Sequence, residues 1–240
     1  KQSQIIFDMF CDGINAMSQQ QTASQHIGDE AYAGARSFEA LLKSVQSVLG
    51  HPYACPVHNL LGCVKLLHTT MLPAGSTVLT NAKMYVDRLY LAGLSTLNVR
   101  GTHAVSFTGD VDIGKVGVML KEKDVPLIIL QVFADGQHPC SLANLKDIKD
   151  IAIRSGTKLV IDGSRIVENA WHIKRYEAGY GNLSIAELVK MIVCISDIFM
   201  MSGTHDAKCN TGGIMTTSST SVYEKLTNEV VVYEGLHTYG

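Results

Sequence analysis

Apolar residues recur every three or four positions in three segments of the chain, and this spacing predicts amphipathic helices. Gly50 and Gly156 follow two of these segments, where glycine commonly ends a helix. Ser184 and Glu187 have the spacing of a capping box at the start of the third. The helices are expected over residues 37–49, 142–155 and 184–194.

Short apolar, β-branched runs lie between the predicted helices and indicate strands. The run LIILQVF at residues 127–133 is apolar on both faces, which is typical of a central strand in a parallel sheet. Strands and helices that alternate with short connections predict an α/β layered domain with a mainly parallel sheet, extending over residues 1–240. The strands are expected over residues 77–80, 127–133, 158–161 and 197–201.

A polar cluster follows each of three apolar runs. In open α/β sheets, ligands bind at the carboxyl ends of the strands. Three clusters in chain order therefore predict one shared crevice. The clusters are Ala134-Asp135-Gly136, Asp162-Gly163-Ser164-Arg165 and Ser202-Gly203-Thr204-His205. Further on, residues 211–213 (TGG) are expected to form a tight turn between strands.

Residues of these clusters have both functional and structural interpretations. Asp162 either pairs with a cationic ring nitrogen or a hydroxyl, or caps the following helix. Arg165 either binds an anionic group or pairs with a surface carboxylate. Ser202 and its neighbouring glycine have the composition of a phosphate-binding loop, and His205 is either a base or a structural residue.

The composition excludes several classes of function. The chain of 240 residues is 46% hydrophobic and 18% charged, which indicates a folded domain. A net charge of −2 gives no basis for binding nucleic acid or an anionic membrane, and no apolar run reaches the roughly 18 residues of a membrane helix. The six scattered cysteines predict buried, reduced thiols in a cytoplasmic protein. The metallohydrolase, dinucleotide-binding, Walker and serine-hydrolase motifs do not occur in the sequence.

Several longer motifs are those of one family. Residues 28–34 (GDEAYAG) and 167–170 (VENA) are the most specific. With these motifs the chain resembles the aromatic amino-acid β-eliminating lyases, tryptophanase and tyrosine phenol-lyase. The resemblance implies the large domain of pyridoxal-phosphate (PLP) fold type I, a three-layer αβα sandwich, and carbon–carbon β-elimination of an aromatic amino acid. Further matching segments are residues 13–18, 161–165, 184–187, 201–213 and 230–235.

Roles for individual residues follow from this resemblance. It implies that Asp162 pairs with the pyridine nitrogen of PLP, which keeps the ring protonated and electron-withdrawing. It places Arg165 beside cofactor and substrate, and Ser202 near the cofactor phosphate. Tyr32 corresponds to a general acid that reaches the leaving group from a neighbouring subunit. The resemblance also implies a K⁺ ion at the subunit interface, coordinated by Gly13, Glu30 and Asn210.

Other positions depart from the family pattern. The family has two consecutive lysines, the second of which binds PLP, whereas this chain has Thr204-His205, and an imidazole forms no stable Schiff base. Lys208 is the nearby amine that could substitute, but it is expected on a strand, facing away from His205. At the position of the family's phosphate-binding loop, this chain has residues 58–62 (HNLLG). The loop keeps Asn59 as a candidate contact to the cofactor phosphate but lacks the family's arginine. Met84 occupies the position of the aromatic residue that stacks on the cofactor ring.

The resemblance leaves three functional hypotheses. The first is PLP-dependent elimination in which His205 or Lys208 moves the proton. The second is a catalytically silent structural or regulatory subunit, and the third is a lysine-independent reaction with His205 as the base. The family forms tetramers, so a homo-oligomer or assembly with a related chain is expected. The family's small C-terminal domain is expected to be absent, since the chain ends at Gly240.

Overall fold

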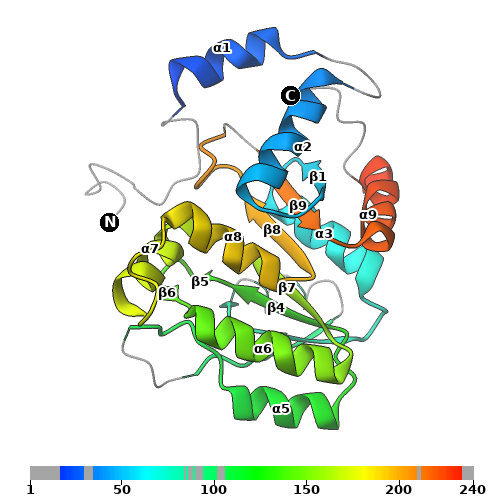
Figure 1. The fold of residues 1–240 in the computed structure, drawn as a ribbon. Coiled ribbons are helices and arrows are strands. Elements are labelled where there is room, and N and C mark those ends of the chain that lie inside the picture. Colours follow the sequence, from blue (N-terminus) through cyan, green and yellow to red (C-terminus); the bar gives the residue numbers. More distant parts are fainter. Residues whose placement is uncertain are drawn as a thin grey trace, which may run out of the picture.

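The computed structural model describes residues 17–29, 35–83, 85, 89, 94–101, 106–209 and 212–233. Within these residues, seven strands form one twisted sheet (Figure 1). Five neighbouring strands are parallel, and β9 runs antiparallel to both of its neighbours. The prediction of a mainly parallel sheet is therefore confirmed. Across the sheet the strands are β3 (Ser95–Asn98), β2 (Thr77–Thr80), β4 (Leu127–Gln131), β7 (Lys158–Asp162), β8 (Ile198–Ser202), β9 (Gly213–Thr217) and β1 (Tyr53–Val57).

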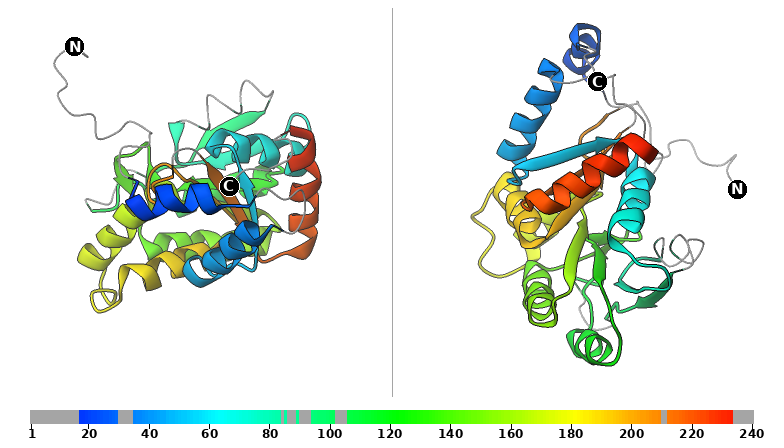
Figure 2. Two further views of the ribbon diagram at one scale, coloured as in Figure 1. Left: turned by 90° about the horizontal axis from the view of Figure 1, so that it is seen from above. Right: turned by 90° about the vertical axis from the view of Figure 1, so that its right-hand side faces the viewer.

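Helices cover both faces of the sheet, which gives the three layers of an αβα sandwich (Figures 1 and 2). Successive residues of β4 alternate between the two apolar cores: Ile128 and Leu130 pack into one, and Leu127 and Ile129 into the other. On the first face lie α2 (Arg36–Val48), α5 (Ile113–Glu122), α6 (Leu142–Ser155), α7 (Ile166–Tyr176) and α8 (Ile185–Ile195). On the second face lie α3 (Leu60–Met71) and α9 (Thr220–Tyr233).

The three predicted helices correspond to α2, α6 and α8. The capping box is present, because the Ser184 hydroxyl accepts from the Glu187 N–H and the Glu187 carboxylate accepts from the Ser184 N–H at 2.7 Å. No described helix is long and apolar enough to cross a membrane. The prediction of buried thiols holds for Cys140 but is wrong for Cys194, which is exposed on α8.

The strand predicted over residues 127–133 is shorter in the structure. It ends at Gln131, and β5 (Phe133–Ala134) then forms an antiparallel pair with β6 (His138–Pro139). Asp135 and Gly136 make the turn between β5 and β6, with φ angles of 54° and 69°. The first polar cluster is thereby folded back over the carboxyl edge of the sheet.

The connection from β8 to β9 also differs from the prediction. Gly213 was expected in a tight turn, but it is the first residue of β9 and pairs with Ser202. Lys208 was expected on a strand, but it lies in the connecting loop with a φ of 52°, which a strand does not allow. The Gln21 amide of α1 (Gln19–Ile27) donates to the Ala207 carbonyl at 3.3 Å and holds this loop. Strand alternation therefore says nothing about which way Lys208 faces.

Candidate functional site

The three polar clusters meet around one cavity beyond the carboxyl ends of β4, β7 and β8, as the pattern predicts. Its volume is about 200 Å³. The second and third clusters contribute Arg165 and His205, and the hairpin after β4 closes another side. The described residues that line it are Gln131, Phe133, Asp135, Gly136, Ser164, Arg165 and His205.

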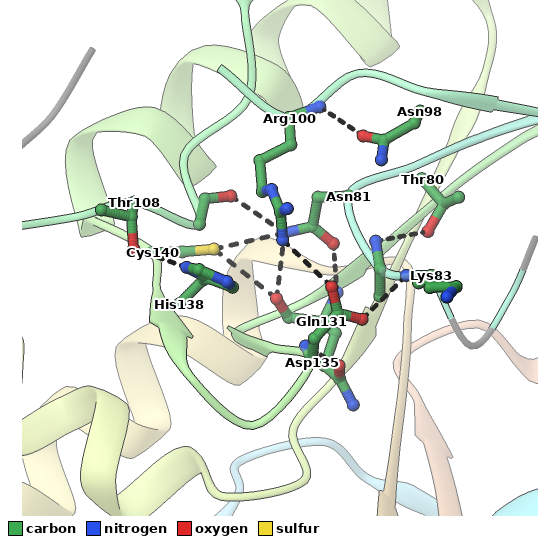
Figure 3. Close-up of polar contacts among 12 residues, drawn as sticks. Thr80, Asn81, Lys83, Asn98, Arg100, Thr108, Gln131, Asp135, His138 and Cys140 are labelled. Atoms are coloured by element: carbon green, nitrogen blue, oxygen red, sulfur yellow. Dashed lines mark hydrogen bonds and ion pairs between the residues drawn. The ribbon is translucent and has the colours of Figure 1, made fainter. Parts of the chain in front are cut away.

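Two residues of the cavity wall have a left-handed backbone that side chains rarely adopt. Asp135 has a φ of 54°, and Arg165, the N-cap of α7, has a φ of 63°. Such strain persists only where surrounding contacts enforce it, and it clusters at functional sites. Asp135 is held by the Lys83 N–H at 2.8 Å and the Arg100 guanidinium at 3.0 Å (Figure 3). The Arg165 guanidinium lies 3.2 Å from Glu168.

Asp162, the last residue of β7, is fully buried beneath this cavity. Its Oδ2 atom accepts hydrogen bonds from the Tyr85 hydroxyl at 2.6 Å and from the Gln131 amide at 2.9 Å. Its Oδ1 atom accepts from the Ser164 N–H at 2.9 Å. Burial raises the pKa of the Asp162 carboxyl, and these hydrogen bonds oppose the rise. Burial and the charge of Asp162 in turn raise the pKa of Tyr85.

Gln131, the last residue of β4, is fixed at both ends of its side chain. Its Oε1 atom accepts from the Asp135 N–H at 2.8 Å, so its amino group faces Asp162. Asn81 fixes the backbone: it accepts from the Gln131 N–H at 2.9 Å and donates to the Gln131 carbonyl at 3.1 Å (Figure 3). The donor to Asp162 is therefore preorganised.

Ser202 and Asn59, which the resemblance places near a cofactor phosphate, make local hydrogen bonds. The Ser202 hydroxyl lies 2.7 Å from that of Thr204 at the end of β8. Asn59 is the N-cap of α3, where its side chain accepts from the Gly62 N–H at 2.9 Å. Neither is among the described residues that line the cavity, and their role toward a phosphate stays a prediction.

Lys208 is likewise not among the described residues that line the cavity. Of the other predicted site residues, Tyr32 and Met84 lie outside the described residues. So do the three predicted K⁺ ligands, Gly13, Glu30 and Asn210. The roles implied for all of them remain predictions.

The sequence interpretation missed Tyr85 and Gln131. Gln131 carries a signal, because it is the one polar residue in the apolar run LIILQVF and comes where the strand ends. Tyr85 carries none, since an aromatic residue in a helical segment is ordinarily a core residue. Only the fold shows that its hydroxyl meets a carboxylate 77 positions further along the chain.

A pair of carboxylates lies beside the cavity. The Asp206 side chain accepts from the Val167 N–H at 3.2 Å at the start of α7. Burial, together with the charge of the nearby Glu168, raises the pKa of Asp206 to about 6. The loop that carries His205 is thus joined to α7 by a carboxyl group whose pKa is raised above its ordinary value.

Comparison with known proteins identifies the family. Residues 4–238 match the sequence profile described as beta-eliminating lyase. The chain belongs to the β-eliminating lyase family. It is 34% identical to the tyrosine phenol-lyase of Intrasporangium calvum over 250 residues, which cover 98% of this chain and 53% of that protein. It is 32% identical to a protein named probable tryptophanase from Aeropyrum pernix, covering 98% of this chain and 54% of that one.

This β-eliminating lyase family chain therefore spans about half the length of these relatives. Its fold is similar to that in the crystal structure of the SepCysS–SepCysE N-terminal domain complex. The TM-score is 0.65 at 15% identity, over 90% of this chain and 55% of that one. The similarity at this identity concerns the fold, and it agrees with the sandwich seen here.

The described residues do not fit PLP in the way that the family resemblance implies. None of the described side chains that line the cavity carries a primary amine, since His205 stands where the family has its lysine. The carboxylate that would pair with the ring nitrogen is Asp162, which is fully buried and already accepts three hydrogen bonds from this chain.

Proposed function

We propose that this chain is a catalytically silent member of the β-eliminating lyase family that serves as a structural or regulatory subunit. The observation that carries the proposal is the imidazole of His205 on a cavity wall whose described residues include no lysine. A neutral imidazole cannot condense with an aldehyde to give a stable Schiff base. The strained backbone of Asp135 and Arg165 supports retention of the cavity as a noncovalent site for a small molecule.

Turnover of an aromatic amino acid is the second candidate function. The 34% identity to a tyrosine phenol-lyase favours it, as does the position of Arg165 and His205 on one cavity. In that case His205 would have to act as the proton-transferring base without a lysine, or Lys208 would have to move toward the cavity.

A turnover assay separates the two candidates. The protein is incubated with PLP, K⁺ and tyrosine or tryptophan, and the release of pyruvate and ammonium is followed, with an active tyrosine phenol-lyase as positive control. The silent-subunit proposal expects no release above the rate of free PLP. If pyruvate release exceeds this rate and H205A abolishes it, the result supports enzymatic turnover instead.

The silent-subunit proposal includes assembly with a second copy or with a lysine-bearing relative. Exposed apolar side chains on two helices support it. Helix α1 has no buried residue, and its Ile27 is 81% exposed. Near the end of α9, Val231 and Val232 are 57% and 70% exposed.

Light scattering should show a mass of two or more chains for the protein, and I27D combined with V232D should lower that mass. A parent that stays monomeric, both alone and mixed with a relative, contradicts assembly.

A further inference from the structure

We infer that Tyr85 and Gln131 replace the cofactor at Asp162, so that this chain excludes a pyridoxal ring even where an amine is available to tether it. The inference deepens the proposed function and rests on it. Loss of the lysine alone would leave the rest of the cofactor site intact. In the structure, however, the Asp162 carboxylate of this site accepts hydrogen bonds from side chains of the chain itself.

The hydrogen bonds to Asp162 leave little room for another donor. Oδ2 accepts from a phenol at 2.6 Å and from an amide at 2.9 Å, and Oδ1 accepts from the Ser164 N–H at 2.9 Å. The carboxylate is fully buried. Both acceptor sites of Oδ2 are occupied, so a pyridinium N–H directed at this atom would have to displace Tyr85 or Gln131 and would leave a buried donor without a partner, which is unfavourable.

Neither donor is able to swing aside without breaking other contacts. Tyr85 is fully buried in the core that also contains Leu67 and Leu89, so its ring has no solvent-facing alternative. Gln131 is held through its Oε1 atom by the Asp135 N–H.

The support for Gln131 extends to a second layer of contacts, which Figure 3 shows. Asp135 accepts from the Lys83 N–H at 2.8 Å and pairs with Arg100 at 3.0 Å. Asn81 holds the Gln131 backbone on both its donor and its acceptor side. The Asn81, Gln131 and Asp162 contacts are buried, whereas those of Asp135 with Lys83 and Arg100 are exposed. A satisfied buried network is rigid and resists insertion of a competing group.

The experiment introduces the amine and then removes the two donors. H205K is compared with the triple variant H205K/Y85A/Q131A, and H205K/L145A is the matched control, since Leu145 is fully buried in the other core. Each variant is checked for folding by thermal melting. Each is then incubated with PLP so that a lysine amine can condense with the aldehyde and release water, and borohydride reduces the resulting carbon–nitrogen double bond. Mass spectrometry quantifies pyridoxyl-lysine at position 205.

We expect about tenfold more trapped cofactor in the triple variant than in H205K alone, the order expected for relief of one unsatisfied buried polar group. The control should trap no more than H205K. Any of three results overturns the inference. The triple variant traps no more cofactor than H205K does, the control traps as much as the triple variant, or a folded triple variant traps none. Stoichiometric pyridoxyl-lysine at Lys208 in the parent protein would contradict the proposed function, whereas efficient trapping by H205K alone contradicts only this inference.

A second measurement needs no multiple variant. Equilibrium dialysis against PLP compares the parent with D162N, with folding again checked by thermal melting. The inference expects the same PLP binding for both proteins, because Asp162 is not accessible to the ring. If the parent binds PLP saturably and D162N does not, the ring reaches this carboxylate, and the inference is overturned.

Discussion

The Tyr85 hydroxyl donates a 2.6 Å hydrogen bond to the carboxylate of Asp162, and both residues are fully buried. Asp162 is the residue that the family resemblance assigns to the ring nitrogen of PLP. Its position at the carboxyl end of β7 is the one expected for a ligand-binding carboxylate. In this chain the same position is part of an internal hydrogen-bond network, which supports our proposal that Tyr85 and Gln131 occupy the carboxylate in place of a ligand.

This contact predicts a large effect for Y85F. The change removes the hydroxyl and leaves a buried carboxylate with one donor fewer, so the free energy of unfolding should fall by about 2 kcal/mol, as for other hydrogen bonds to charged groups. Urea denaturation measures it. The matched control is Y180F, whose hydroxyl accepts from Lys146 at an exposed site and should cost well under about 1 kcal/mol. Equal losses in the two variants would contradict the assignment.

Close packing behind the site predicts that G163A is destabilising. A Cβ atom at Gly163 would lie 2.2 Å from the ring of Phe199, which is fully buried and cannot move away freely. We expect the free energy of unfolding to fall by about 3 kcal/mol, as for overpacked cores. The control is G117A on α5, where a Cβ atom would meet no atom within 4 Å other than those of its chain neighbours and the helix backbone, and alanine should stabilise the helix by up to ~1 kcal/mol. If G163A is as stable as the parent, the Phe199 ring moves aside at little cost, which contradicts the prediction.

The raised pKa of Asp206 predicts a pH dependence of stability. Its folded-state pKa of about 6 lies above the ordinary value of 3.8, so the folded state binds this proton more tightly than the unfolded state does. The resulting contribution to stability is complete below pH ~4 and is lost as the pH rises through 6. D206N should flatten this fall and, after allowance for partial exposure, raise the free energy of unfolding at pH 7 by roughly 1 kcal/mol.

Urea denaturation of D206N and the parent at pH 4, 5, 6 and 7 tests this prediction. The asparagine oxygen can still accept from the Val167 N–H, so the cap on α7 is kept. E168Q removes the neighbouring charge and should flatten the fall in the same direction. A D206N protein that keeps the slope of the parent contradicts the prediction.

Much of the fold could be predicted because local patterns and tertiary structure agree. Helix α6 begins and ends where the apolar spacing and Gly156 predict, since this glycine adopts the left-handed conformation with a φ of 69°. Strand β3 was missed because it is a half-exposed edge strand without an apolar run. The end of β4 was misplaced because the turn at Asp135 uses a positive φ that composition does not reveal.

The site could be predicted only in part. The polar clusters around Asp135, Arg165 and His205 were found because parallel strands end at one edge of a sheet. The partners of Asp162 were not found, because hydrogen bonds between residues 77 and 31 positions apart depend on strand order and helix placement. Lys208 was misplaced for a related reason, since a loop rather than a strand carries it.

Borohydride reduction of the unmodified protein in the presence of PLP, followed by peptide mass spectrometry, shows whether any amine of the chain tethers the cofactor. The account predicts that no lysine of the cavity region carries a pyridoxyl group, because His205 has replaced the tethering amine and Lys208 is not among the described residues of the cavity wall. A pyridoxyl group on Lys208, formed stoichiometrically and lost in D162N, would contradict it.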